Sequence, residues 1–108
     1  MTQSRSERRA IRRFALDLPV SVKRLGDAEH DASGRTRDVS SRGIFMLVSS
    51  EMAAGSPIEF IMTLPSEITL TDPVRVHCSG RIVRVERNEH EHGVAVAIDR
   101  YDFVGEEV

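Results

Sequence analysis

The residues best suited to chemistry are arginines gathered at the N-terminal end of the sequence. Residues 1–13 hold one acidic residue and five arginines, which are Arg5, Arg8, Arg9, Arg12 and Arg13. The planar guanidinium group can donate two parallel hydrogen bonds to a phosphate and also matches the O6 and N7 acceptors of guanine. Arg9 and Arg13 lie four positions apart, so they can share a face of a helical turn or wrap a ligand from an extended arm. A solvated basic tail is the plainer interpretation of the same segment.

A second group of polar residues occupies positions 38–43, which read DVSSRG. Asp38 and Ser40 can hydrogen-bond to nearby backbone amides and hold a tight turn. Gly43 permits a positive φ and a close approach of the backbone to a ligand. A carboxylate at Asp38 can also accept hydrogen bonds from N1 and N2 of guanine. A well-formed turn without a ligand is again the plainer interpretation.

The two groups are spaced so that they can meet in the fold. The 25 positions from Arg13 to Asp38 leave room for a strand, a loop and a second strand. A strand pair returns the chain to the end of the sheet from which it started, so the arginines and Asp38 would lie close together. Together they favour a guanine nucleotide with exposed phosphates as the ligand.

The elements that position these residues are predicted to be β-strands, because apolar residues recur at every second position. The expected strands are 16–22, 35–39, 44–48, 58–64, 74–85 and 94–98. The expected connections are a loop at 26–34, a turn at 40–43, a connector at 50–55, a loop at 65–73 and a hairpin turn at 88–93. The tail, 101–108, is long enough for one or two helical turns.

Two residues predict irregularities in this pattern. Pro19 lacks an amide donor and should lie at an edge or a bulge, and Gly80 should mark a bulge inside the strand 74–85. Six short strands joined by turns indicate an antiparallel barrel or sandwich. A chain of 108 residues has room for one modest domain. We expect a basic arm at 1–13 and a β-domain at 14–108.

The same residues resemble those of the PilZ domain family. The matching stretches are RAIRR at 9–13, LDLPV at 16–20, DVSSRGIF at 38–45, GRIVRV at 80–85 and GVAVAI at 93–98. The resemblance covers roughly residues 7–103. It implies an all-β fold, a six-stranded antiparallel barrel of the split-barrel type. It also implies binding of the bacterial messenger cyclic di-GMP, often as a stacked pair of molecules.

The resemblance assigns ligand contacts to the N-terminal arginines. Arg9 and Arg13 match the family's Arg-x-x-x-Arg motif, which contacts phosphates and guanine edges. Arg8 precedes the motif and would add a further contact. Arg8 and Arg12 have the same spacing, but Arg13 aligns better with the stretch that follows.

The turn carries the second motif that the resemblance implies. Asp38, Ser40 and Gly43 match the family's Asp/Asn-x-Ser-x-x-Gly and would contact the other guanine. One departure is the short C-terminus, since many members continue into a longer helix. Functions that rest on that helix are not expected here.

No other residues form a recognisable reactive site. The histidines, which are His30, His77, His90 and His92, lack the spacing of a zinc site. Cys78 shares the phase of neighbouring valines and is expected to fill the core. There is no Gly-x-Ser-x-Gly motif and no glycine-rich phosphate loop. We therefore expect no catalytic residues, no metal and no cofactor.

Location in the cell follows from what the sequence lacks. The single cysteine cannot form an internal disulfide. Residues 1–13 contain no apolar stretch of the kind found in signal peptides, and no apolar run approaches the roughly 20 residues of a spanning helix. We expect a cytoplasmic protein without membrane insertion.

We interpret the sequence as a non-enzymatic receptor for cyclic di-GMP. Its arm is expected to be mobile without ligand and to fold over the barrel once the ligand neutralises the arginines, which alters the surface offered to a partner protein. The alternative is a PilZ-like adaptor that binds a partner and no nucleotide. Nucleic-acid binding through the arm is disfavoured by the net charge of -2 and the lack of an aromatic stacking platform.

Overall fold

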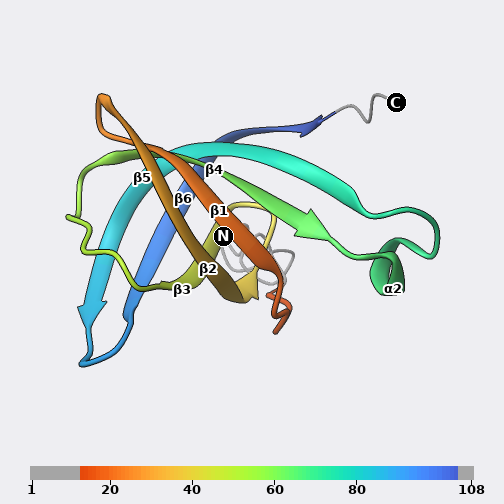
Figure 1. The fold of residues 1–108 in the computed structure, drawn as a ribbon, viewed down its shortest axis with the longest axis horizontal. Helices are drawn as coiled ribbons and strands as arrows, with labels where there is room; N and C mark the ends of the chain where they lie inside the picture. Colours follow the sequence, from red (N-terminus) through yellow and green to blue (C-terminus); the bar gives the residue numbers. More distant parts are fainter. Residues whose placement is uncertain (1–12, 105–108) are drawn as a thin grey trace, which may run out of the picture.

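The computed structural model describes residues 13–104, which form an all-β fold with one short helical turn (Figure 1). The elements in chain order are β1 Pro19–Leu25, β2 Ala28–Val39, β3 Gly43–Val48, β4 Pro57–Leu64, α2 Ser66–Thr69, β5 Val74–Arg87 and β6 His92–Val104. The six expected strands are present, and the predicted six-stranded antiparallel barrel is confirmed.

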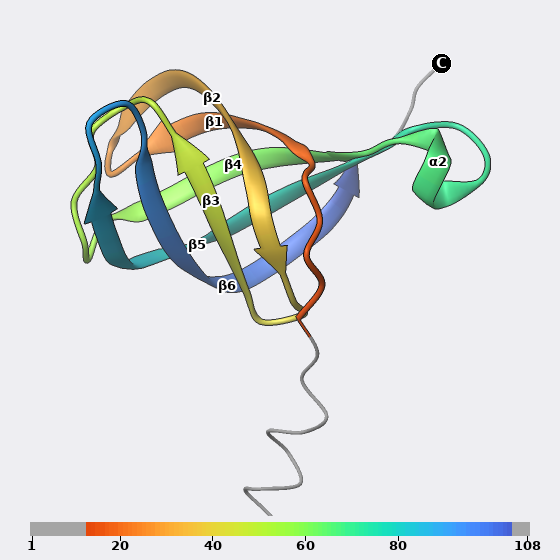
Figure 2. The same ribbon diagram turned by 90° about the horizontal axis from the view of Figure 1, so that it is seen from below.

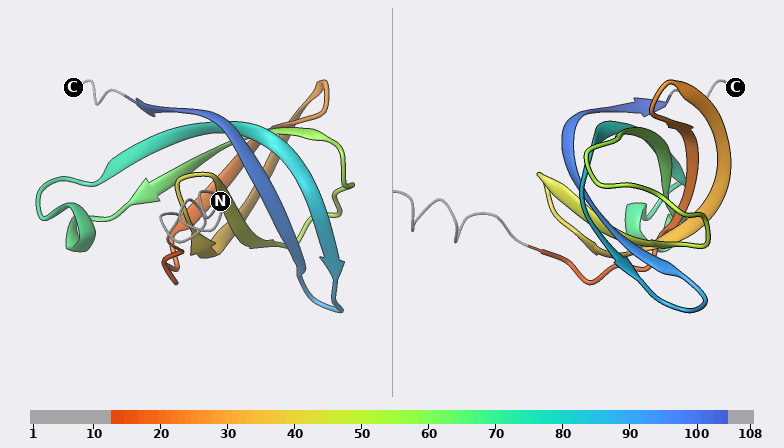
Figure 3. Two further views of the ribbon diagram at one scale, coloured as in Figure 1. Left: turned by 180° about the vertical axis from the view of Figure 1, so that it is seen from behind. Right: turned by 90° about the vertical axis from the view of Figure 1, so that its left-hand side faces the viewer.

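The strands close on themselves in the order β1–β2–β3–β6–β5–β4, with β4 beside β1. Every neighbouring pair is antiparallel. Consecutive strands pair with one another except β3 and β4, and two long-range pairs, β1 with β4 and β3 with β6, complete the ring. Figure 2 and the right-hand view of Figure 3 show this ring around the core. Closure pairs the strand edges that would otherwise be exposed in the barrel wall.

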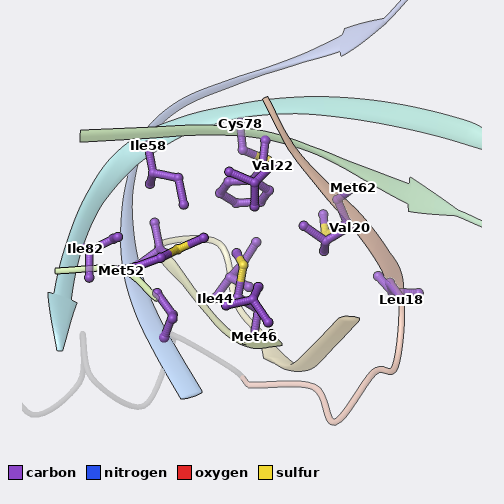
Figure 4. Close-up of a cluster of buried hydrophobic side chains, with 14 of the residues drawn as sticks. Leu18, Val20, Val22, Ile44, Met46, Met52, Ile58, Met62, Cys78 and Ile82 are labelled. Atoms are coloured by element: carbon purple, nitrogen blue, oxygen red, sulfur yellow. The ribbon is translucent and has the colours of Figure 1, made fainter. Parts of the chain in front are cut away.

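The core is built from aliphatic and sulfur-containing side chains packed around one aromatic ring (Figure 4). Phe60 supplies that ring and is 0% exposed. Because successive side chains of a strand point to opposite faces, every strand except β2 contributes alternate hydrophobic residues to the core. β3 contributes Ile44, Met46 and Val48, and β4 contributes Ile58, Phe60 and Met62. The burial pattern therefore follows the alternation that the sequence showed.

Thr36 is the one buried polar residue among positions 13–104, with 2% of its surface exposed. Its Oγ1 accepts a hydrogen bond from the Leu18 N–H at 2.9 Å and donates one to the Leu16 carbonyl oxygen. Its own N–H donates to the Leu18 carbonyl at 2.9 Å. These bonds hold the segment before β1 against β2, so Thr36 helps to set where the chain enters the barrel.

Several predicted boundaries in the N-terminal half were wrong. The first strand begins at Pro19, because residues 16–18 bond to Thr36 ahead of the β1 ladder. The loop expected at 26–34 is mostly strand, since β2 starts at Ala28 and the turn has Gly26 at φ 64°. Each position in the first half of β2 is exposed or half-buried. That stretch therefore lacks the apolar alternation by which a strand is recognised.

The C-terminal half also departs from expectation. The loop 65–73 contains the short helix α2. The tail, whose structure the sequence left open, is strand rather than helix as far as Val104, where β6 ends, and residues 105–108 lie outside the described part. Beyond Ile98 this strand is mostly exposed, so its sequence lacked the apolar signal that marks a buried strand.

The bulge predicted at Gly80 lies on the partner strand instead. The register shifts between Ser79 and Gly80, but the inserted residue is Asp99 of β6. Gly80 is needed for close packing, since a Cβ there would lie 2.1 Å from the Ala97 carbonyl oxygen. The residue inserted in β5 is Val83, which falls between two residues paired with consecutive positions of β6. The bulge of β5 therefore lies at Val83, three positions after Gly80.

Burial of Cys78 makes the stability of the barrel sensitive to alkaline pH. Desolvation raises the pKa of its thiol from 9.0 to about 11, because the thiolate is disfavoured inside the barrel. The unfolded chain therefore releases this proton first. The resulting stability is fully present below pH 9 and is lost as the pH rises toward 11.

We expect the free energy of unfolding to fall by about 2 kcal/mol between pH 8 and pH 11 on account of this thiol. Urea denaturation of the native protein and of Cys78→Ala at both pH values measures the effect. Cys78→Ala should lose less stability between pH 8 and pH 11 than the native protein, because it lacks the thiol and shares every other titrating group. Equal losses would contradict the assignment.

Within residues 13–104, no helix has the length and apolar character required to traverse a lipid bilayer.

Candidate ligand-binding site

A hollow of about 510 Å³ lies on the outer surface of the barrel, beside the turn between β2 and β3. Its volume falls within the range of roughly 300–1,000 Å³ that small-molecule sites occupy. The charged and hydroxyl-bearing residues around it are Arg13, Arg37, Asp38, Ser40, Arg42, Arg84 and Glu86. The apolar lining comes mainly from β3, β5 and β6. This hollow is the candidate site.

A pair of backbone hydrogen bonds brings the arm's end to the turn. The N–H of Phe14 donates to the Val39 carbonyl at 2.8 Å, and the N–H of Val39 donates to the Phe14 carbonyl at 2.9 Å. Figure 2 shows the chain before β1 running beside the end of β2. Arg13 and Asp38, each one position before a bridged residue, therefore line the same hollow. The predicted contacts Arg8 and Arg9 lie outside the described residues.

Ser40 holds the turn that forms one wall. Its Oγ accepts hydrogen bonds from the N–H of Gly43 at 3.0 Å and of Arg42 at 3.2 Å, and it donates to the Gly43 carbonyl at 3.1 Å. The Ser40 N–H donates to the same carbonyl at 2.9 Å. Because the turn already engages this hydroxyl, Ser40 is placed to shape the site. A direct contact of Ser40 with a ligand stays a prediction.

Gly43 and Asp38 present different features to the hollow. Gly43 does not use the positive φ that a glycine permits, since Gly26 and Gly55 are the glycines with positive φ among the described residues. Gly43 instead allows close approach, because a Cβ there would lie 3.1 Å from the Val96 carbonyl oxygen. The half-buried Asp38 carboxylate receives no side-chain hydrogen bond from residues 13–104. Its acceptor oxygens are therefore available to a ligand.

Two β-bulges aim side chains into the site from opposite sides. In β2, Thr36 pairs with Met46 and Asp38 pairs with Phe45, so Arg37 is the inserted residue. Arg37 and Asp38 consequently both line the hollow. In β5 the inserted residue is Val83, and Val83 and Arg84 consequently both line the hollow as well. Bulges commonly redirect side chains beside functional sites.

An aromatic ring lies close to two of the arginines. The guanidinium carbon of Arg37 is 5.0 Å from the centroid of the Phe45 ring, and that of Arg84 is 5.8 Å away. Both distances suit cation–π contacts. The ring covers Gly93, where a Cβ would lie 2.5 Å from the Phe45 Cζ. These contacts hold Arg37 and Arg84 along the wall of the hollow.

The electrostatics of the site favour an anion. Four arginines line the hollow against two carboxylates, Asp38 and Glu86. Among the lining residues of segment 13–104, the one ion pair joins Arg84 to Glu86 at 3.3 Å. Arg13, Arg37 and Arg42 therefore bring positive charge that no described carboxylate neutralises. An anionic ligand with hydrogen-bond donors for Asp38 would match this arrangement.

Several residues of this site had no role predicted from the sequence, among them Arg37, Arg42, Phe45, Arg84 and Glu86. Arg42 and Phe45 stood within the quoted stretch 38–45 but were given no role. Arg37 is inserted at a bulge that no local pattern indicated, and Arg84 follows the bulge of β5, which the sequence predicted at Gly80 rather than at Val83. No cluster of three or more potential metal ligands occurs within the described chain.

Comparison with known proteins assigns a family. The PilZ domain model matches residues 3–107, which is nearly the whole chain. No curated protein matches the sequence at a significant level. The matched span includes all six strands and every residue that lines the hollow.

Proposed function

The chain belongs to the PilZ domain family, and we propose that it is a receptor for cyclic di-GMP that acts by binding rather than by catalysis. PilZ domains are generally cyclic di-GMP receptors, and they are binding domains rather than enzymes. Signalling to a downstream protein, through the surface around the occupied hollow, is part of this proposal.

One observation carries the proposal, the meeting of Arg13 with Asp38 in a hollow whose arginines are largely unpaired. Cyclic di-GMP has two phosphates and two guanines. Guanidinium groups can bind its phosphates and the O6 and N7 acceptors of guanine. The unbonded carboxylate of Asp38 can accept from the N1 and N2 donors of the same base.

The small residues beside the turn support binding of a flat ring. Ala95 and Ala97 of β6 line the hollow next to Gly43, so the backbone there is open to close approach. Phe45 and its two arginines border the hollow from another side. Arg8 and Arg9 enter the proposal through the family motif alone.

Calorimetric titration with cyclic di-GMP and, in parallel, with cyclic di-AMP tests the proposal. We expect saturable binding of cyclic di-GMP in the micromolar range. Cyclic di-AMP should bind at least about tenfold more weakly, because adenine lacks the N1–H and N2 donors that Asp38 would accept and a missed base contact costs roughly 1–3 kcal/mol. Asp38→Asn should reduce the difference in affinity between cyclic di-GMP and cyclic di-AMP.

The controls separate this function from its alternatives. No saturable heat at roughly hundred-micromolar cyclic di-GMP would contradict the proposal, as would equal affinity for both cyclic dinucleotides. A partner protein that copurifies without nucleotide would support the adaptor instead. Affinity for cyclic di-GMP should fall as salt is raised, since exposed arginines are screened.

A further inference from the structure

The C-terminal half of β6 has a free edge. β6 pairs with β3 only as far as Ala97, whereas its pairing with β5 continues to Val104. Within residues 13–104, the side of β6 that faces away from β5 therefore has no strand partner after Ala97. Figure 1 shows this part of β6 along the outer margin of the sheet, and the left-hand view of Figure 3 shows it extending past the ring of strands. Such an edge is a template for pairing with another chain.

Two exposed aromatic residues lie on this segment of β6. Tyr101 is 49% exposed and Phe103 is 69% exposed. They pair with Cys78 and Val76 of β5, both of which face the core. Directly paired residues point to the same face of a sheet, so the two rings extend the core-facing side of the sheet beyond the barrel. Burying them against a partner would remove apolar surface from water.

The opposite face of the same edge carries a self-complementary charge pattern. Arg100 and Asp102 flank Tyr101, and neither forms an ion pair within the described residues. An antiparallel pairing with a second copy, related by a two-fold axis, must be centred on one residue. When the pairing is centred on Tyr101, Arg100 of each copy lies opposite Asp102 of the other, which gives two pairs of opposite charge. Centred on Arg100 or on Asp102, it opposes like charges, which is unfavourable.

We propose that residues 99–104 of β6 form a homodimer interface by antiparallel pairing with the same edge of a second copy, centred on Tyr101. The two barrels then share a continuous sheet. A two-fold interface needs a patch that is complementary to itself, and the order of residues 100–102 provides one. Because few residues take part, the dimer is of the weak, concentration-dependent kind.

The interface lies apart from the hollow that we assign to cyclic di-GMP. None of residues 99–104 lines that hollow. The dimer is therefore expected to form without nucleotide. Its absence would not contradict cyclic di-GMP binding, and an absence of binding would not contradict the dimer.

Sedimentation velocity without nucleotide, over a protein concentration series, tests the proposal with a charge exchange. We expect the native chain to dimerise in the range of tens of micromolar. Arg100→Asp and Asp102→Arg should each weaken dimerisation about tenfold, because each opposes like charges at both symmetric positions. The double variant, R100D with D102R, should restore the dimer, since the exchanged pair is again complementary.

An exposed arginine at the other end of the same strand pair serves as the control. Arg87→Asp alters a charge opposite His92, far along β6 from the proposed interface, and should leave dimerisation unchanged. Circular dichroism checks that every variant is folded. A native chain that stays monomeric at roughly 200 micromolar would overturn the proposal. So would a double variant that dimerises no better than the single ones.

Discussion

Replacing Arg13 with alanine should weaken cyclic di-GMP binding by about 100-fold without unfolding the protein. Arg13 is exposed and lines the hollow, and the hydrogen bonds between Phe14 and Val39 hold the adjacent backbone beside Asp38. Its side chain makes no ion pair with the described residues, so its removal breaks no such contact in the barrel. A charge-assisted contact contributes roughly 1.5–3 kcal/mol, which corresponds to about 10- to 150-fold in affinity.

Calorimetry on matched variants measures this effect. Arg13→Lys should lie between the native protein and Arg13→Ala, because lysine keeps the charge and loses the two-pronged geometry. Arg24→Ala is the control, since Arg24 is exposed and lines a different hollow. Native affinity in Arg13→Ala, or an equal loss in Arg24→Ala, would show that Arg13 does not contact the ligand. Thermal melting establishes that the variants are folded.

The largest stability effect is expected from Phe60→Ala, which should destabilise the barrel by about 3–5 kcal/mol. Phe60 is fully buried and is the one aromatic side chain in the core of the described residues. Its truncation removes apolar contacts from β4 and leaves a cavity that the closed ring of strands cannot easily collapse to fill. Small domains have a total stability of about 5–15 kcal/mol, so this loss would remove a large share of the stability of the barrel.

Denaturation in urea at 25 °C measures the change. Phe103→Ala is the matched control, because its ring is 69% exposed, and it should cost less than about 1 kcal/mol. Both proteins are measured at low micromolar concentration to keep dimerisation from contributing. A loss below about 1 kcal/mol for Phe60→Ala would mean that the core is less tightly packed than the burial of this ring implies.

The sequence predicted the fold class because most strands have one buried face. Residues 44–48 and 58–64 alternate so regularly that the structure changed their bounds by little. The first half of β2 and the end of β6 were missed because they are exposed at most positions. Their pairing partners lie elsewhere in the chain and leave no local pattern. Such strands can be recognised only once the barrel is assembled.

For the candidate site, sequence reasoning found the residues that stand in local motifs. It placed Arg13 and Asp38 at the same end of a strand pair, and both line the hollow. It missed Arg37 and Arg84 because each adjoins or forms a bulge, where the alternation that predicts inward and outward positions is interrupted. Whether a residue is inserted depends on the register with the neighbouring strand. A single strand read alone cannot reveal that register.

The position of the hollow on the outer wall of the barrel has an evolutionary consequence. Phe60 and its neighbours hold the fold together from inside, while the arginines around the hollow face solvent and add little to that packing. Selection can therefore act on these outward positions almost independently of the scaffold. Lineages that carry the same barrel are free to change or abandon their ligand through a few surface substitutions. Orthologues should accordingly diverge in specificity faster than in shape.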